Sequence, residues 1–400
     1  MWSSISLLPD DPIFGLNALF LKDQHPQKVN LGIGAYKDAA GKPVVLNSVH
    51  TAEKLLLEKG FNKEYPPMEG LPEFIQASMT LIFGKDNPLL TDGRLVGIQS
   101  VGGTGALRIA AELVSQKCSK NVFLPTPTWP NHQQIFNFAG LKVSSFPYYN
   151  QNTHGLDMTL MIQAIKEMPP RSLIVLHGCC HNPTGLDPSL AQWQELSHLI
   201  KKQQLLPFFD LAYQGFAQNL EADAAGIRLF VADGHEMLVA NSFSKNFGLY
   251  GERVGSLAII SQDAATSRNV KSFVKQLIRS NYSMPPIHGA QIVTTILKSE
   301  SLRAEWKLEL QEMRYRIITM RQALVAGLHA LQTPIDFSFI NEQTGMFSFS
   351  GLNEAQVLCL REHYGIYTPL NGRINIAGLN ESNIDYVVHS ISQTLTSHET

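Results

Sequence analysis

A lysine preceded by two serines, with an arginine eight positions further on, carries the strongest chemical signal in the chain. Lys245 lies in a loop between two apolar runs that are predicted to be buried strands. A lysine that bonds covalently to a carbonyl group needs a lowered pKa, which partial burial beside other cations provides. Ser242 or Ser244 could donate to a dianionic phosphate, and Arg253 could grip it as a fork. The pattern suits a pyridoxal phosphate anchor, whereas an isolated lysine of this kind is more often a surface-loop residue.

A glycine turn between a predicted strand and a predicted helix offers a second anion site. The strand at 95–100 runs into Gly102, Gly103 and Thr104, where a helix begins. Free amides and the helix dipole converge at such a place, so the turn could cradle a phosphate. A dinucleotide fingerprint is disfavoured because its third glycine is missing. A turn that only allows close helix packing stays open.

A carboxylate ends another apolar run, and a phenol follows three residues later. Asp210 is costly to bury unless it faces a cation, and a protonated pyridine nitrogen would be that cation. Tyr213 could then reach the neighbouring phenolic oxygen of the same ring. The alternative is an aspartate that caps the following helix.

Two further stretches contain candidate ligands. Residues 177–185 combine two histidines with an adjacent cysteine pair, but the C-x₂-C spacing of zinc sites is absent, so no metal is predicted. The Asn182 amide in this stretch could donate to a ligand oxygen. Trp129 follows a short predicted strand and is either core or a flat platform for an aromatic ring.

Composition and charge limit the class of protein. The chain has 400 residues, 44% of them apolar and 16% charged, as in a soluble enzyme. A formal net charge of −2 gives no footprint for nucleic acid or an anionic membrane, and no apolar run is long enough to span one. The N-terminus lacks a secretory core, and the four cysteines suggest no disulfide framework, so we expect a cytoplasmic protein.

The elements predicted from periodicity alternate apolar runs with helical segments and then change character. A long charged helix at 301–331 is expected to link two parts of the molecule. Beyond it we predict short strands at 337–340 and 346–349, and helices near 354–364 and 381–396, which form a small α/β unit.

Taken in order, these motifs resemble the aspartate/aromatic subgroup of the class I aminotransferases, which are fold type I pyridoxal phosphate enzymes. The resemblance spans the whole chain and is carried by residues 30–34, 102–108, 129–132, 177–185, 210–213, 242–250 and 372–373. It implies an α/β fold with a large domain, built on a mostly parallel central sheet between helices, and a smaller α/β domain. The implied organisation is an inter-subunit arm at 1–15, a small domain at 16–47 and 311–400, and a large domain at 48–310.

The resemblance also implies roles for the candidate residues. Lys245 would hold pyridoxal 5'-phosphate covalently and then move the proton as the catalytic base. Asp210 would keep the pyridine nitrogen protonated, Asn182 and Tyr213 would bond the phenolic oxygen, and Trp129 would stack on the ring. The phosphate side would be bound by Gly102, Gly103, Thr104, Ser242, Ser244, Arg253 and, from the neighbouring subunit, Tyr65.

Two arginines would bind the substrate. By the same resemblance, Arg373 clamps the α-carboxylate, with Gly34 closing over it, and Trp129 and Asn182 line the same site. Arg279 of the neighbouring subunit would pair with a side-chain carboxylate, which makes a homodimer with shared active sites the expected assembly. The implied reaction transfers the amino group of L-aspartate to 2-oxoglutarate, giving oxaloacetate and L-glutamate.

Two departures from the subgroup pattern leave the donor open. Met284 occupies a position where the subgroup usually has Asn, and Pro66-Pro67-Met68 stiffens the loop after Tyr65. An aromatic amino acid aminotransferase acting on tyrosine or phenylalanine is therefore the alternative. A β-lyase or decarboxylase of the same fold fits the two arginines less well. A ligand sensor of a transcription regulator would need a basic helix-turn-helix, which is not found before residue 30.

Overall fold

The computed structural model describes residues 2–7 and 13–397, which divide into two compact units. Unit 1 comprises the residues up to Pro43, Pro183–Gly185 and the residues from Arg316 on. Unit 2 comprises Val44–Asn182 and Leu186–Tyr315. The predicted arm at 1–15 includes residues 1 and 8–12, which lie outside the described residues, so its role stays a prediction. In the described part of the chain, no helix is long and apolar enough to cross a membrane.

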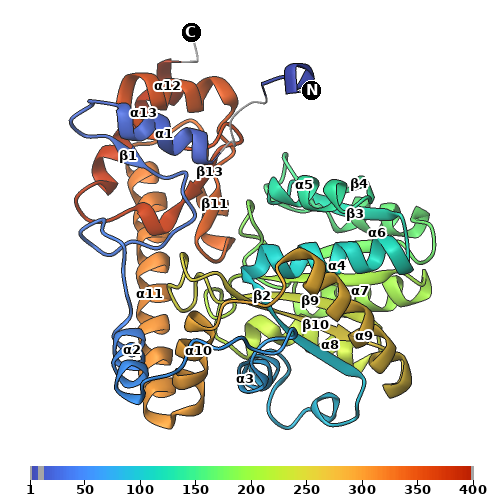
Figure 1. Ribbon diagram of the computed structural model, residues 1–400. Coiled ribbons are helices and arrows are strands. Elements are labelled where there is room, and N and C mark those ends of the chain that lie inside the picture. The colour runs from blue at the N-terminus through green and yellow to red at the C-terminus, as the bar shows by residue number, and fades with distance from the viewer. Residues whose placement is uncertain (1, 8–12, 398–400) are drawn as a thin grey trace. The chain divides into compact units, whose positions relative to one another are not determined.

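Unit 2 contains one large sheet and most of the helices (Figure 1). Its sheet strands are β2 (Leu95–Val101), β3 (Asn121–Thr126), β4 (Lys142–Pro147), β7 (Leu173–His177), β8 (Leu206–Leu211), β9 (Met237–Ser242) and β10 (Val254–Ile260). A separate small hairpin pairs β5 (Tyr149–Asn150) with β6 (Gly155–Leu156). The helices are α2 (Asn47–Lys59), α3 (Pro72–Phe83), α4 (Gly102–Lys117), α5 (Asn131–Phe138), α6 (Met158–Glu167), α7 (Leu190–Lys202), α8 (Ala225–Ala232), α9 (Ala264–Asn281) and α10 (His288–Lys298), with short 3₁₀ turns η2 (Pro88–Leu90) and η3 (Ala222–Ala224).

The seven-stranded sheet has the order β2-β10-β9-β8-β7-β3-β4. Strand β10 is antiparallel to both of its neighbours, and all the other pairs are parallel. The three strands β7, β9 and β10 are buried at every residue, as expected for strands that helices cover on both faces. The expected α/β fold with a mostly parallel central sheet is confirmed.

Alternate residues of each strand face different helices. Phe208, Leu238 and Leu257 join one core cluster with apolar residues of α4, α5 and α9. On the opposite face, Phe209 packs against Trp193 of α7 and Phe230 of α8, with ring centroids 5.6 and 5.0 Å apart. Because alternate side chains of a strand point to opposite faces of the sheet, each face is apolar and is covered by its own layer of helices.

Local signals in the sequence set several helix ends. Helix α7 begins at a capping box in which Ser189 and Gln192 satisfy each other's backbone amides. Asp263 caps α9 by accepting from the Thr266 amide. Helix α3 has Pro72 in its first turn, where a missing N–H does no harm, and stops at Gly84, whose φ is +87°.

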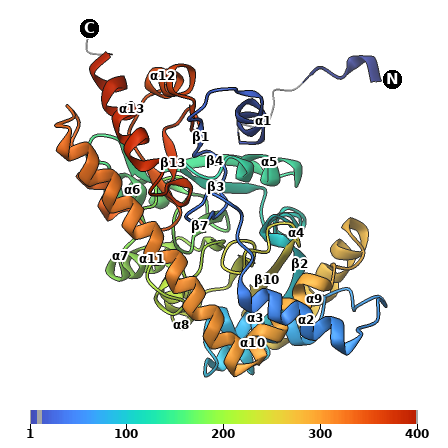
Figure 2. The ribbon, with the colours of Figure 1, turned by 90° about the vertical axis from the view of Figure 1, so that its left-hand side faces the viewer.

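Helix α11 (Glu300–Ala330) runs through both units, with its first half in unit 2 and its second half in unit 1. The remaining elements of unit 1 are η1 (Trp2–Ser4), α1 (Phe14–Lys22), β1 (Val29–Asn30), η4 (Ser338–Glu342), β11 (Phe347–Phe349), α12 (Glu354–Tyr364), β12 (Ile366–Tyr367), β13 (Arg373–Asn375), η5 (Ile376–Gly378) and α13 (Ile384–Ser397). Strand β1 pairs in parallel with β12, and β11 pairs antiparallel with β13. Figure 2 shows α11 along its whole length.

One predicted element is wrong. Residues 337–340 alternate apolar and polar side chains like a strand, but residues Ser338–Glu342 form the 3₁₀ turn η4. The cause is Asp336, whose carboxylate accepts from the amide (2.9 Å) and hydroxyl (2.8 Å) of Ser338 and so nucleates a turn. The predicted strand at 346–349 is confirmed as β11.

Candidate active site

The candidate residues of unit 2 gather at one edge of the sheet, because its topology puts the relevant strand ends there. Parallel strands β3, β7, β8 and β9 all finish at this edge, each followed by a loop that carries candidate residues. Strand β2 also ends there, and the antiparallel β10 begins there. The register confirms this arrangement, since Val254 pairs with Val101 and Gly255 with Ser242.

Gly102, Ser242, Ser244 and Arg253 form a cradle at the start of α4. The Gly102 amide donates to the Arg253 carbonyl (2.9 Å), and Arg253 Nη1 lies 3.5 Å from Ser244 Oγ. A Cβ built on Gly102 would meet Arg253 Nη2 at 2.6 Å, and the φ of Gly102 is +66°. A Cβ built on Gly103 would meet Ser242 Cβ at 3.1 Å. The absence of a Cβ at both glycines therefore leaves room for the Arg253 guanidinium and the Ser242 side chain to lie against the start of α4, beside the buried hydroxyls of Ser242 and Ser244.

No side chain caps the first turn of α4, which consists of Gly102, Gly103, Thr104 and Gly105. The amides of a first helical turn have no partner within the helix, and the helix dipole favours an anion beside them. The donor set of amides, hydroxyls and one guanidinium fits a phosphate group.

The Lys245 side chain lies beside Tyr213. Its Nζ is 5.1 Å from the centre of the Tyr213 ring. Burial lowers the pKa of Lys245 to about 8, helped by the charge of Arg253 and opposed by the carboxylate of Asp210. At pH 7 about a tenth of this amine is thus unprotonated, far more than for an ordinary lysine, as a nucleophile or base requires.

Asp210 is buried but keeps its charge. Burial favours the protonated acid, yet the hydrogen bond with His132 and the nearby ammonium group of Lys245 hold the pKa of Asp210 below its usual value. His132 Nε2 lies 3.0 Å from Asp210 Oδ2. Asp210 lies in β8, at the edge of the sheet where the candidate residues gather, and it does not cap a helix. The alternative of a helix-capping aspartate is therefore wrong.

A chain of hydrogen bonds fixes which nitrogen of His132 carries a proton. The Asn182 amide donates to His177 Nδ1 (3.3 Å), so the proton of the neutral His177 ring lies on Nε2. Burial lowers the pKa of His177 well below its ordinary value, which keeps that ring neutral. His177 Nε2 then donates to Thr128 Oγ1 (2.9 Å), and with a neutral His132 ring the hydroxyl donates onward to His132 Nδ1 (2.9 Å). His132 Nε2 is left as the donor to Asp210.

Thr128, His132 and His177 were not among the site residues expected from the sequence. His132 is fully buried at the start of α5, and its ring meets Trp129 edge to face at 5.3 Å between centroids. The signal that could have found it is Asp210 itself, because a buried carboxylate needs a donor. Trp129 is half-buried, and Asn182 and Tyr213 are buried in the loops after β7 and β8.

Tyr65 and Arg279 differ from this group because both are surface residues of the single chain. The Tyr65 residue is 80% exposed. Arg279 lies in the last turn of α9 and donates to Ser283 Oγ. Within the described residues, neither has a recorded contact with Lys245 or Asp210.

Arg373 and Gly34 lie together in unit 1. The Arg373 guanidinium stacks over the Phe347 ring, with Cζ 4.1 Å from its centre, and Nη2 donates to the Gly32 carbonyl. A Cβ on Gly34 would collide with Phe347 Cζ at 2.8 Å. Arg373 is 3% exposed, so its guanidinium is a largely desolvated cation.

The stretch at 177–185, for which no metal was predicted, does not bring its cysteines and histidines into one cluster of possible ligands among the described residues. Among the described residues, the grouped donor atoms are those of Cys179, Cys180 and Asp223, all within 4.8 Å of one another. The Asp223 carboxylate already accepts from the backbone amides of Gly215, Ala217, Gln218 and Asn219. A hydrogen bond with Cys180, together with burial, raises the pKa of the Cys179 thiol well above its usual value.

An α/β fold with a lysine, an ionised carboxylate and a phosphate cradle at the carboxyl edge of its sheet defines a pyridoxal phosphate-dependent transferase. The family model for class I and II aminotransferases matches residues 26–391, and the chain belongs to this family. It is therefore an aminotransferase whose cofactor is pyridoxal 5'-phosphate.

Full-length relatives carry two kinds of name. Aspartate aminotransferase of Escherichia coli K12 is 48% identical over 396 residues, covering 99% of this chain and 100% of that protein. The structure of an aromatic-amino-acid aminotransferase from Burkholderia pseudomallei, covalently bound to pyridoxal phosphate, is 46% identical with a TM-score of 0.96 and 99% coverage of both chains. Aspartate aminotransferase from Saccharomyces cerevisiae cytoplasm is 40% identical with a TM-score of 0.97, covering 100% of this chain and 99% of that one.

Proposed function

We propose that the enzyme transfers the amino group of L-aspartate to 2-oxoglutarate, giving oxaloacetate and L-glutamate in two half-reactions. The observation that carries this proposal is the 48% identity to an aspartate aminotransferase over essentially the whole of both chains. The side chains described above supply what such a reaction needs: a base, an electron-sink partner, an anion cradle and a carboxylate clamp.

Pyridoxal phosphate, when bound, supplies the carbonyl carbon that takes up the amino group and a ring that accepts electrons from the substrate Cα. The residues that would hold its phosphate are Gly102, Gly103, Thr104, Ser242, Ser244 and Arg253, with Tyr65 of the second subunit. Trp129 would stack on the ring, and Asn182 and Tyr213 would donate to its phenolic oxygen.

Lys245 and Asp210 would share the proton chemistry. With a pKa near 8, Lys245 Nζ is able both to accept a proton from the substrate Cα and to return it. Asp210 stays anionic because His132 donates to it, so it stabilises a proton on the ring nitrogen.

Two arginines would recognise a dicarboxylate. Arg373 would bind the α-carboxylate as a bidentate fork, for which its desolvated guanidinium is suited, with Gly34 at the same Phe347 ring. Asn182 and Trp129 would line the same substrate site. Arg279 would bind the side-chain carboxylate from the neighbouring subunit, for which its surface position on α9 is suited.

We also propose a homodimer with shared active sites, an inter-subunit arm at 1–15, domains bounded at 16–47 with 311–400 and at 48–310, and a cytoplasmic location. The 80% exposure of Tyr65 supports a role in a second subunit. All four cysteines are free thiols, which supports a reducing compartment.

Aromatic donors are a second candidate because of Met284. It follows Ser283, the acceptor of Arg279, so an apolar side chain lies one residue from the partner of the proposed carboxylate clamp. The 46% identity to an aromatic-amino-acid aminotransferase supports the same extension of substrate range.

The test is the absorption spectrum of the purified holoenzyme with L-aspartate and no oxo acid. Loss of the band of the lysine-bound cofactor, with gain of the amino form, and reversal by 2-oxoglutarate are the expected results. If aspartate leaves the spectrum unchanged while phenylalanine converts it, the aspartate assignment is wrong and the aromatic one replaces it.

A further inference from the structure

A cavity apart from the candidate active site lies in unit 2, on the side of the sheet that carries α3 and α8 (Figure 1). It has a volume of about 1030 Å³ and lies between α3, α8 and the first part of α11; we call it the α3–α11 cavity. Residues 73, 76, 77 and 80 of α3 line it at helical spacing, as do Arg303, Trp306 and Lys307 of α11. None of the residues assigned to cofactor or substrate lines it.

The lining of this cavity is cationic in a chain whose net charge is −2. It has three acidic side chains, Glu73, Asp86 and Glu221, against six cationic ones: Lys85, Arg94, Arg228, Lys298, Arg303 and Lys307.

Half of these cations are already paired. Lys298 pairs with Glu73 (3.0 Å), Arg94 pairs with Asp92 (2.8 Å), and Arg228 pairs with Glu221. Lys85, Arg303 and Lys307 form no ion pair with any residue in the described ranges. Concentrated positive charge around a hollow raises the local concentration of anions. We propose that the α3–α11 cavity is an effector site for a small polyanion, one that carries two or more phosphate or carboxylate groups.

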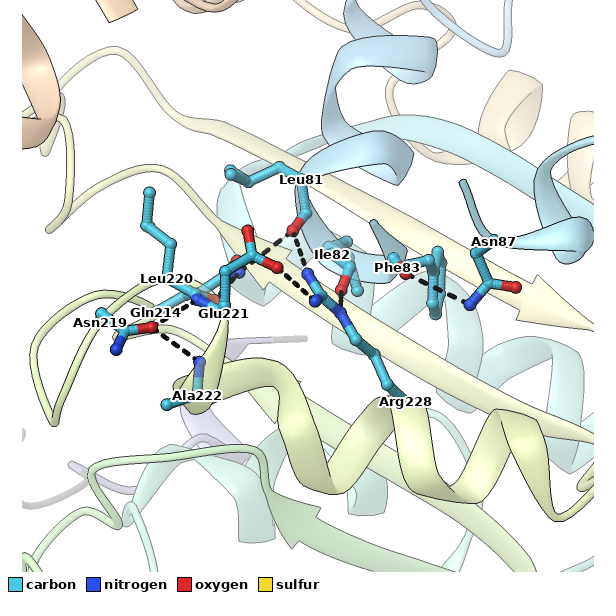
Figure 3. Close-up of polar contacts among 10 residues, drawn as sticks. All are labelled: Leu81, Ile82, Phe83, Asn87, Gln214, Asn219, Leu220, Glu221, Ala222 and Arg228. Carbon is cyan, nitrogen blue, oxygen red and sulfur yellow. Dashed lines mark hydrogen bonds and ion pairs between the residues drawn. The ribbon is translucent and has the colours of Figure 1, made fainter. Parts of the chain in front are cut away.

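The cavity wall is connected to the residue that follows Tyr213. Figure 3 shows Arg228 and Gln214 converging on the last turn of α3. Arg228 Nε donates to the Ile82 carbonyl (2.9 Å) and Nη2 to the Leu81 carbonyl (3.3 Å). Gln214 Nε2 donates to the same Leu81 carbonyl (3.2 Å) and to that of Leu220 (2.8 Å). Glu221, the exposed partner of Arg228, is the group with which a bound anion would compete.

A second connection leads to the residue that follows Lys245. Trp306 Nε1 donates to the Asn246 carbonyl (2.7 Å), and Asn246 Nδ2 donates to the Gln214 carbonyl (3.1 Å). The Trp306 ring stacks on Phe247 at 4.3 Å between centroids. The side chains of this second connection are interior. Each is 0% exposed: Gln214, Asn246, Phe247 and Trp306. A polyanion that moves α11 or releases Arg228 therefore shifts the loops that carry Lys245 and Tyr213.

The binding test is calorimetric titration of the holoenzyme with inorganic tripolyphosphate, and in a second arm with tricarballylate, at about 150 mM salt. We expect saturable binding that is at least tenfold weaker in R303E/K307E. The control is K142E/K166E, which makes the same change of net charge at exposed lysines that do not line the cavity and should bind within twofold of the parent. The arm with the tighter binding identifies the source as phosphorylated or carboxylate metabolites. R303Q/K307Q, at least threefold weaker, replaces the reversal variant if the latter fails to fold.

Absence of saturable binding in both arms would overturn the proposal, and so would equal weakening by both charge-reversal pairs. The coupling rests on the proposed roles of Lys245 and Tyr213 and has its own measurement, the pH midpoint of the bound cofactor's absorbance. A saturating polyanion should move this midpoint by at least 0.3 pH unit, and W306F, which loses the donor to Asn246, should bind the anion but lose most of the shift. An unchanged midpoint in the parent enzyme would refute the coupling, whereas the calorimetric result stands whether or not the enzyme uses aspartate.

Discussion

Replacement of Gly102 by alanine is the most direct test of the phosphate cradle. The new Cβ would lie 2.6 Å from Arg253 Nη2 and 3.0 Å from Arg253 Cζ. Real Cβ atoms do not approach so closely, so the guanidinium must leave its position. The backbone adds strain, because Gly102 has a φ of +66° and an L-residue there costs about 1–2 kcal/mol.

The expected loss follows from what the displaced guanidinium does. A hydrogen bond to a charged group contributes about 1.5–3 kcal/mol, which corresponds to about 10- to 100-fold in affinity. We therefore expect Gly102→Ala to weaken pyridoxal phosphate binding to the apoenzyme by that factor, measured by the absorbance of the bound form. Binding of pyridoxal, which has no phosphate, should change by less than about threefold because Lys245 is untouched.

A matched control lies in the same loop region as Arg253. A Cβ on Gly251 would meet nothing within 4 Å, and its φ is not positive, so Gly251→Ala should bind the cofactor like the parent. Parent-like affinity for pyridoxal phosphate in Gly102→Ala would refute the cradle. An equal loss for pyridoxal and pyridoxal phosphate would mean that the variant disturbs the fold and not the anion site.

Three further predictions concern the other candidate residues. The rate at which the apoenzyme reacts with pyridoxal should rise with pH and level off above about 8, because the neutral amine of Lys245 is the reacting form. Asp210→Asn removes the negative charge that raises the pKa of Lys245, so it should move the midpoint of this pH profile down. An upward move would contradict the electrostatic argument. Arg279→Ala should lose far more kcat/KM with aspartate than with phenylalanine; equal losses would remove Arg279 from its role. Lys245→Ala should be inactive but dimeric, and mixing it with Arg279→Ala should restore about a quarter of the parent sites if Arg279 serves the neighbouring subunit of a symmetric dimer; no gain on mixing would place Arg279 in its own subunit.

Much of the fold could be predicted because its signals are local. The apolar runs that became β7, β9 and β10 are too short for helices and are bounded by turn residues. The strand predicted at 337–340 failed for an equally local reason, since Asp336 outcompetes the alternating pattern by binding the backbone two residues on. Such a hydrogen bond can be anticipated from the sequence only if the turn-forming tendency of Asp is compared with the strand-forming tendency of the alternating apolar residues.

Site residues could be predicted from the sequence where the residue type alone indicates a chemical role. They could not be predicted where the role depends on a contact that the sheet topology creates. Lys245 and Asp210 could be named from the sequence because an amine and a carboxylate after apolar strands need a reason to be there. His132 could not, because it comes 78 positions before Asp210 and reaches it only through the sheet order that places β3 two strands from β8. The group that determines which nitrogen of His132 carries the proton lies even further from Asp210: it is the backbone amide of Asn182, which acts through His177 and Thr128. His132, which is assigned no contact with cofactor or substrate, thus helps to keep Asp210 charged, and only the folded chain connects the two residues.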